Sequence, residues 1–175
     1  MEGDRFVESD MESNRGGYAK REYLGFDLRF TALTGAGMTQ LRGEYISGRQ
    51  PGLAGSSRSP NSDIRPSGDT YIRPFAGWYA IMIQDLGTTP LSVVLKYDIY
   101  DPNTKVSGDR AGENGTGRAD LALKTFGYGL LWKFHHTFGL QAFYENVKNE
   151  TSVNVMGYET IRKADLFTLR LQYRF

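Results

Sequence analysis

The segment FTLRLQYRF, at positions 167–175, has the most regular pattern in this chain. Phe167, Leu169, Leu171, Tyr173 and Phe175 alternate strictly with polar or charged residues. Successive side chains of a β-strand point to opposite faces of the sheet, so this alternation predicts a strand with one apolar face and one polar face.

The same two-residue period recurs through most of the chain. It is clear over residues 24–32, 39–45, 91–100 and 126–134, and less regular over residues 140–147. Over residues 71–84 both faces carry large apolar side chains, so the parity there is ambiguous. The pattern predicts an all-β protein of about seven antiparallel strands, roughly ten residues each, with no helix longer than a turn or two.

The connections between these strands alternate in length. Residues 34–37, 85–90 and 135–139 form short, turn-like links, whereas residues 49–69, 102–120 and 148–163 form long polar ones rich in Gly, Ser, Asn and Asp. In a meander this alternation places every long loop at one end and every tight turn at the other. Outer-membrane barrels have this plan, with short periplasmic turns and long extracellular loops.

The composition excludes several other classes of protein. The 175 residues have a formal net charge of +1 and no cysteine, and the mean hydropathy is -0.47. No apolar run approaches the ~20 residues of a membrane helix, so a helical membrane protein is excluded. Disulfides and thiolate chemistry are absent. The balance of 21 Lys and Arg against 20 Asp and Glu gives no reason to expect nucleic acid as a partner.

A soluble antiparallel β-sandwich would show the same alternation, because its inner face is apolar. Two features favour a membrane barrel. Charged residues recur on the polar face of strand after strand, as a water-filled lumen requires. Aromatic residues stand near the ends of the apolar face, where membrane proteins place aromatic girdles; these are Tyr45, Tyr97, Trp132, Phe134, Tyr173 and Phe175.

Three segments resemble a known family. They are LKYDIYDPNT at 95–104, LRGEYISGRQPG at 41–52 and TLRLQYRF at 168–175. Together they are similar to the C-terminal part of the phosphate-selective porins, the O- and P-type porins of Bacteroidetes-like bacteria. The resemblance runs from about residue 23 to the end. It implies an outer-membrane barrel, a homotrimer, contact with the lipid bilayer and lipopolysaccharide, and passive diffusion of small hydrophilic solutes.

Strand parity adds an expectation about the extent of the domain. A bacterial outer-membrane barrel has an even number of strands, and about seven strands fall short of the ~8 of the smallest barrels. We therefore expect residues 18–175 to be the C-terminal part of a larger barrel, a fragment without its signal peptide and first strands. Residues 1–17 are expected to be the remnant of an extracellular loop.

The candidate functional residues are the charged side chains predicted to face the lumen. Rings of fixed charge in a pore select ions by sign. The excess of basic residues, with Arg21 among them, predicts a modest preference for anions, although opposite charges could instead pair across strands and stiffen the wall. We do not expect phosphate selectivity, because no dense ladder of Arg and Lys is present. The predicted pore-lining residues are Arg29, Arg42, Glu44, Lys96, Asp98, Lys133, Glu145, Arg170 and Arg174.

Other chemistry finds little support in the sequence. His135 and His136 lie in a predicted turn without a third ligand at metal-site spacing, which favours a solvated turn over zinc. Residues 101–104 with Asp109 resemble a calcium loop only superficially, because Lys105 stands at a ligand position, and they predict a turn that ends a strand. With both histidines in a turn, no Ser, His and acid set can form. We expect no enzyme, no metal and no cofactor.

The sequence thus predicts an outer-membrane porin that passes small hydrophilic solutes or ions. Two alternatives remain open. One is an outer-membrane binding or adhesion barrel whose long loops contact ligands. The other is a soluble β-sandwich binding module.

Overall fold

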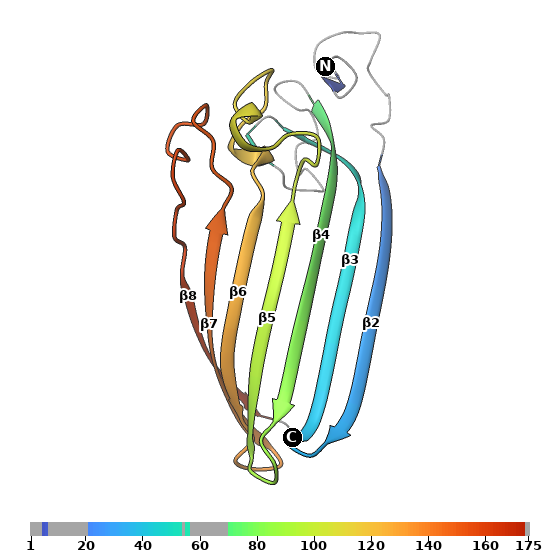
Figure 1. The fold of residues 1–175 in the computed structure, drawn as a ribbon, viewed down its shortest axis with the longest axis vertical. Coiled ribbons are helices and arrows are strands. Elements are labelled where there is room, and N and C mark those ends of the chain that lie inside the picture. The colour runs from blue at the N-terminus through green and yellow to red at the C-terminus, as the bar shows by residue number, and fades with distance from the viewer. Residues whose placement is uncertain (1–4, 7–20, 54, 57–69, 174–175) are drawn as a thin grey trace.

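The computed structural model describes residues 5–6, 21–53, 55–56 and 70–173. Seven strands form one antiparallel meander in which each strand pairs with its neighbours in sequence (Figure 1). This confirms the prediction of about seven antiparallel strands. They are β2 (Glu22–Thr34), β3 (Gly37–Leu53), β4 (Thr70–Asp85), β5 (Leu91–Asp101), β6 (Leu123–Trp132), β7 (Phe138–Asn149) and β8 (Leu166–Tyr173).

The remaining described elements are short. A two-residue strand, β1 (Arg5–Phe6), pairs with β4, and the rest of the expected loop remnant at 1–17 lies outside the described residues. Two single helical turns, η3 (Gly108–Arg110) and η4 (Arg118–Asp120), interrupt the connection between β5 and β6. No helix in the described ranges has the length and apolarity needed to cross a membrane.

The hairpin of β3 and β4 is longer than the sequence predicts. These strands have 17 and 16 residues, and their pairing extends to Leu53 opposite Thr70. The alternation fades near Gly48, Pro51 and Gly52, which is why the long connection was expected to begin at residue 49. Pairing with β4 keeps this stretch extended, so the connection is confined to residues 54–69.

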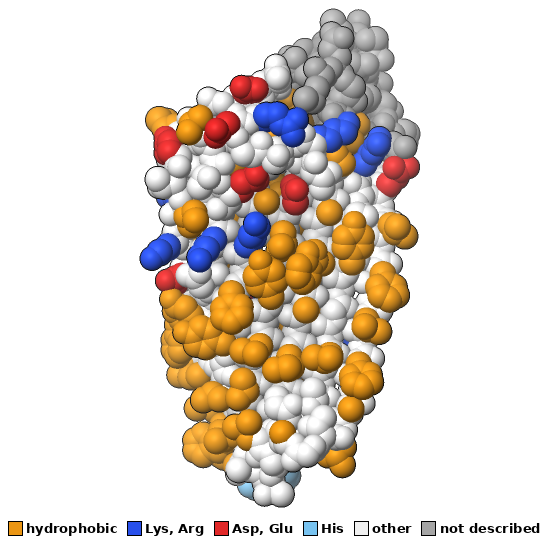
Figure 2. Space-filling model, in the orientation of Figure 1, with side chains coloured by type: hydrophobic (Ala, Val, Ile, Leu, Met, Phe, Trp, Pro, Cys, Tyr) orange, Lys and Arg blue, Asp and Glu red, His pale blue; other side chains and the backbone are white. Residues whose placement is uncertain are grey.

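The register sorts the side chains onto two faces, because residues directly opposite each other on neighbouring strands share a face. One pairing row joins Phe30, Leu41, Met82, Leu95 and Tyr128, and continues to Tyr144 and Phe167. We call the face that carries this row the apolar face. Figure 2 shows it as a broad band of hydrophobic side chains across the sheet.

The opposite face, which we call the polar face, is the more enclosed. In Figure 1 the lower part of β8 passes behind β7 and β6, so the sheet bends away from the viewer. Figure 2, in the same orientation, shows the hydrophobic side chains facing the viewer, so the apolar face lies outside the bend. On the polar face Val94 and Phe143 are each 9% exposed, whereas on the apolar face Leu169 is 63% exposed. The side chains that converge inside the bend are therefore the ones that shield one another.

The connections lie as the alternation of loop lengths predicts. Residues 35–36, 86–90 and 133–137 link strands at the lower end in Figure 1, and residues 102–122 and 150–165 link them at the upper end. Gly37 has a φ of +118°, and a Cβ there would lie 2.6 Å from the Asp85 carbonyl oxygen. Only glycine fits both conditions, so this position fixes the tight turn that follows β2.

The described sheet is open. β2 and β8 are its two edges, each paired on one side along its length. A closed barrel is therefore not formed by these seven strands. The structure shows a single-layered, two-faced antiparallel sheet with its loops sorted by length.

Candidate functional site

The polar face gathers most of the charged residues that the sequence places in a lumen. One pairing row joins Arg29 and Arg42 on β2 and β3 to Lys96 on β5 and Glu145 on β7. The adjoining row joins Asp27, Glu44, Tyr79 and Asp98 on the first four strands of the meander. Arg170, on β8, lies opposite Gln141 on the same face.

Two of the predicted residues are not on a described strand. β6 ends at Trp132, so Lys133 lies in the tight connection, where its backbone N–H donates to the Pro90 carbonyl at 2.8 Å. The alternation of residues 126–134 continues past the end of pairing, which is why the sequence placed Lys133 on a strand. Arg174 lies outside the described residues.

Lys96 is the centre of an ion-pair cluster on this face. Its Nζ lies 2.9 Å from Asp98 Oδ2 and 2.8 Å from Glu145 Oε1. Glu145 is two strands away, and the residue between them in the pairing row is Gly127. Because Gly127 has no side chain, the lysine can reach across β6. Here the charges pair across strands, which is the wall-stiffening role that opposite charges on a sheet face can have.

Basic and acidic side chains are equal in number on the polar face of the described strands. The described strands place five basic residues (Arg29, Arg42, Arg73, Lys96 and Arg170) and five acidic ones (Asp27, Glu44, Asp85, Asp98 and Glu145) on the polar face. The basic excess expected from the sequence came from Arg21, Lys133 and Arg174. Arg21 precedes β2 and Lys133 follows β6, so neither belongs to the strands of the wall.

The polar face also contains an apolar strip that the sequence did not locate. Ile81, Ile83, Val94 and Phe143 lie on it, which explains the ambiguous parity of residues 71–84 and the irregular alternation of residues 140–147. The Phe143 ring lies over β6, where a Cβ on Gly127 would come within 2.7 Å of it and a Cβ on Gly129 within 2.6 Å. The two glycines on the polar face of β6 are the feature of the sequence that could have revealed that a large side chain covers this strand.

Replacing Gly127 by valine is expected to destabilise the protein by about 1–3 kcal/mol, because the new side chain would overlap the Phe143 ring. It would also stand between Lys96 and Glu145. Denaturant unfolding in detergent micelles measures the effect. Adding Phe143→Leu to Gly127→Val should recover part of the lost stability. Phe143→Leu alone should not stabilise the wild-type protein. Additive effects of the two changes would contradict this packing.

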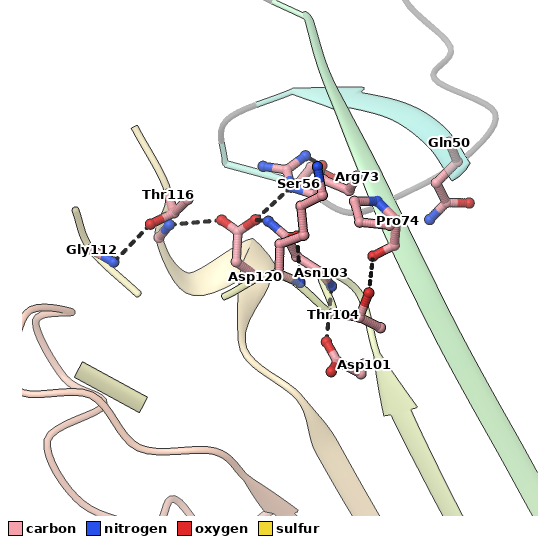
Figure 3. A network of polar contacts seen from close by, with 12 residues as sticks. Gln50, Ser56, Arg73, Pro74, Asp101, Asn103, Thr104, Gly112, Thr116 and Asp120 are labelled. Carbon is pink, nitrogen blue, oxygen red and sulfur yellow. Dashed lines mark hydrogen bonds and ion pairs between the residues drawn. The ribbon is translucent and has the colours of Figure 1, made fainter. Parts of the chain in front are cut away.

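At the loop end a buried polar network fixes the connection between β5 and β6. Arg73 and Asp120 are 3% and 1% exposed, and Arg73 Nε donates to Asp120 Oδ1 at 2.7 Å. The same carboxylate accepts from Asn103 Nδ2 and from the Gly117 backbone N–H, both at 2.8 Å (Figure 3). Nothing in the sequence pattern distinguished these two charges from solvent-exposed loop residues.

The two long described loops pack on each other. Val106, Ala111, Leu121 and Val155 form a buried cluster that Tyr158 covers. The Glu150 carboxylate accepts from the backbone N–H groups of Gly108 and Ala122 at 2.7 and 3.1 Å, and Ser152 Oγ donates to the Ala111 carbonyl at 2.6 Å. We call these packed connections, residues 102–122 and 150–158, the loop cap. The sequence predicts only long polar connections here, and the structure shows that they form a small folded unit.

The remaining candidates lie where turns were predicted. His135 and His136 are in the connection between β6 and β7, with His135 Nδ1 and Thr137 Oγ1 2.7 Å apart. The Asp101 carboxylate accepts from the Asn103 backbone N–H at 2.9 Å, so this segment is the strand-ending turn that was predicted. Within the described ranges, no three His, Asp or Glu residues lie together as metal ligands would.

Asp165, just before β8, is a carboxyl group at the loop end that accepts side-chain hydrogen bonds and lies near two lysines. The Tyr144 hydroxyl and the Asn146 side-chain amide, which lies 2.5 Å away, donate hydrogen bonds to it and hold the pKa of the Asp165 carboxyl below its usual range. Lys163 and Lys148 act in the same direction through their positive charges. Asp165 is therefore ionised at neutral pH.

Comparisons of the chain with protein-family models, with curated proteins and with solved structures find no match.

Proposed function

We propose that the chain forms part of the wall of an outer-membrane porin, a channel for small hydrophilic solutes or ions of the kind that the phosphate-selective porin family contains. The observation that carries this proposal is the pair of contrasting faces on one sheet. Large apolar side chains cover one face of all seven strands and stay exposed, while the other face carries the charged rows. We propose a homotrimer in the outer membrane, in contact with lipid and lipopolysaccharide.

The apolar face fits a lipid environment better than water. A soluble monomer rarely exposes a contiguous apolar patch larger than a few hundred Å². Here Phe26, Leu28, Tyr128, Leu130 and Leu171 are each between 49% and 67% exposed. A transmembrane strand needs about 9–11 residues, and β5, β6 and β7 have 11, 10 and 12.

Aromatic side chains mark the two ends of this band. Trp132 and Phe134 lie 5.0 Å apart between ring centroids at the short-turn end, and Phe138 and Tyr173 lie 4.8 Å apart beside them. Trp78 and Tyr97 lie 5.5 Å apart toward the loop end. Rings of this kind are enriched at both interfaces of a membrane.

The open edges are consistent with a larger barrel. β2 and β8 run in the same direction, because an antiparallel meander of seven strands begins and ends alike. Closing it with every pair antiparallel requires an odd number of further strands between β8 and β2. In hydrocarbon each unpaired backbone group costs several kcal/mol, so a membrane-inserted sheet must close. We propose that this sheet is one portion of a closed barrel.

Lys96→Gln tests the channel and its charged wall together. The proposal predicts stepwise currents in planar bilayers for the wild-type protein. The substitution leaves Asp98 and Glu145 without their shared cation, so the cation-to-anion permeability ratio should rise about two- to fivefold, the range of one partly exposed ion pair. Reversal potentials in a salt gradient measure it.

Glu145→Gln is the matched control for this experiment, since it removes the opposite charge of the same pair and should lower that ratio. A complete absence of stepwise current in the wild-type protein would contradict the porin proposal. Equal shifts of both variants in one direction would contradict a lumenal position for the cluster.

A second candidate function, a binding or adhesion barrel, has its own supporting observation. The loop cap is packed and hydrogen-bonded rather than extended, so it presents a fixed surface at one end of the sheet. Such a barrel would insert in membranes without conducting. The soluble sandwich has no comparable support, because the described strands form one sheet and none of the other described residues forms a second layer over its apolar face.

A further inference from the structure

Three lysines form a row across the apolar side of β6, β7 and the segment before β8. Lys124 pairs directly with Lys148, and Lys148 forms an isolated β-bridge with Lys163. Residues directly opposite each other have Cβ atoms about 4.5–5.5 Å apart, so three ammonium groups project side by side. Figure 2 shows basic side chains standing together immediately above the hydrophobic band on this side of the sheet.

This arrangement is unfavourable unless an anion balances it. Like charges directly opposite each other on a sheet destabilise it. All three lysines are exposed, and none of them forms an ion pair among the described residues. On the polar face, by contrast, Lys96 is held between two carboxylates.

The row lies at the border of the apolar band. The next pairing row toward the short turns contains Phe126, Asn146 and Asp165, and the row after that contains Tyr128, Tyr144 and Phe167. On the other strands the lysine row continues through Ile99 and Trp78. The lysines are therefore level with the aromatic side chains that mark the loop-end interface.

Asp165 offsets only part of this charge. Its carboxylate is engaged by Asn146 and Tyr144, and one negative charge against three positive ones leaves the patch at +2. The patch therefore keeps a capacity for a doubly charged anion that sits at the depth of lipid headgroups.

We propose that Lys124, Lys148 and Lys163 bind the phosphate groups of a phosphorylated glycolipid in the leaflet at the loop end. The charge of the row complements phosphate, whose oxygens accept charge-assisted hydrogen bonds from ammonium groups. Below the row the apolar band begins at Phe126 on β6 and, one row further, at Phe167 on β8, so the acyl chains of the same lipid would lie along Phe126, Tyr128 and Phe167. This inference rests on the proposed insertion in a membrane but not on the conduction of solutes.

Native mass spectrometry of the full chain, released from detergent micelles, tests the proposal. The probe is a bis-phosphorylated, acylated glucosamine disaccharide (lipid A), compared with the same lipid after removal of its phosphates. Lys124→Gln with Lys148→Gln should weaken binding of the phosphorylated form roughly 20- to 30-fold at low salt, from the effect of two lysines at an anionic surface. Lys124→Arg with Lys148→Arg should retain it.

Arg110→Gln with Arg118→Gln is the matched control, because it removes two exposed basic charges from the loop cap and should leave lipid binding unchanged. Equal binding of both lipid forms, or an equal loss in the control, would overturn the proposal. Displacement by inorganic phosphate at concentrations comparable to the lipid would show a site for a soluble anion instead. A protein that binds the lipid but passes no current would contradict the porin function and leave this site standing.

Discussion

Asp120→Ala is expected to destabilise the protein by about 3–5 kcal/mol, more than any other single change in the loop cap, because it removes the carboxylate from a buried ion pair. Arg73 is 3% exposed, and its Nε lies 2.7 Å from Asp120 Oδ1. The substitution also removes the acceptor for Asn103 Nδ2 and for the Gly117 backbone N–H. The effect is measured by denaturant unfolding in detergent micelles.

The loop should report this loss directly. Residues 102–122 should become a protease-sensitive site in Asp120→Ala, because the network holds the connection against β4. Glu113→Ala removes an exposed carboxylate from the same connection and should change neither stability nor cleavage. Replacing both partners, with Arg73→Met and Asp120→Leu, should cost less than Asp120→Ala alone, since the buried guanidinium is then removed together with the carboxylate that it contacts. Equal effects of Asp120→Ala and Glu113→Ala would contradict the network.

The strands were predictable because two-faced strands leave a period of two in the sequence. Over residues 24–32 and 126–132 the alternation assigned every outward side chain correctly, and the sorting of long and short connections was correct as well. The prediction weakened where both faces of the sheet are apolar. Ile81 and Phe143 face the inside of the bend, and no local pattern reveals that a side chain is covered by a residue two strands away.

The sequence predicted which residues lie in the candidate site, but not which of them pair with one another. Parity alone placed Lys96, Asp98 and Glu145 on one face. That Lys96 reaches Glu145 depends on register and on the missing side chain of Gly127, and register is a property of two strands rather than of one. The partnership of Arg73 with Asp120 is harder still to foresee, since 47 residues separate them along the chain.

The distribution of buried apolar side chains has a consequence for folding. The described core cluster lies in the loop cap, whereas the sheet leaves its largest apolar residues exposed. Hydrophobic burial within the chain therefore stabilises the loops more than the strands. The strands must gain their stability from hydrogen-bonded pairing and from whatever covers the apolar face, a role that the proposed membrane would fill without a protein partner.

An arginine substitution on the apolar face should destabilise the protein much more than an arginine at the neighbouring position on the polar face. Leu130 and Leu131 are neighbours on β6 whose side chains point to opposite faces, opposite Ala142 and Gln141 respectively. If lipid covers the apolar face, Leu130→Arg should destabilise the protein by about 2–4 kcal/mol, the cost of arginine near the bilayer midplane. Leu131→Arg should cost under about 1 kcal/mol, because its charge enters water. Urea unfolding from phospholipid vesicles compares the two.

Arginine substitutions at two depths along a strand distinguish a membrane from a protein partner as the cover of the apolar face. Leu169 lies in the same pairing row as Leu130, through Ala142, whereas Leu171 lies one row nearer the short turns, with Leu140 and Trp132. The cost of a lipid-facing arginine falls to about 0–1 kcal/mol near an interface, so Leu171→Arg should cost less than Leu169→Arg. A protein partner that packs on this face would penalise both positions alike, since burial of an unpaired charge does not depend on distance from the end of the strand. Equal costs at residues 169 and 171, or equal costs at residues 130 and 131, would therefore exclude lipid as the cover of the apolar face.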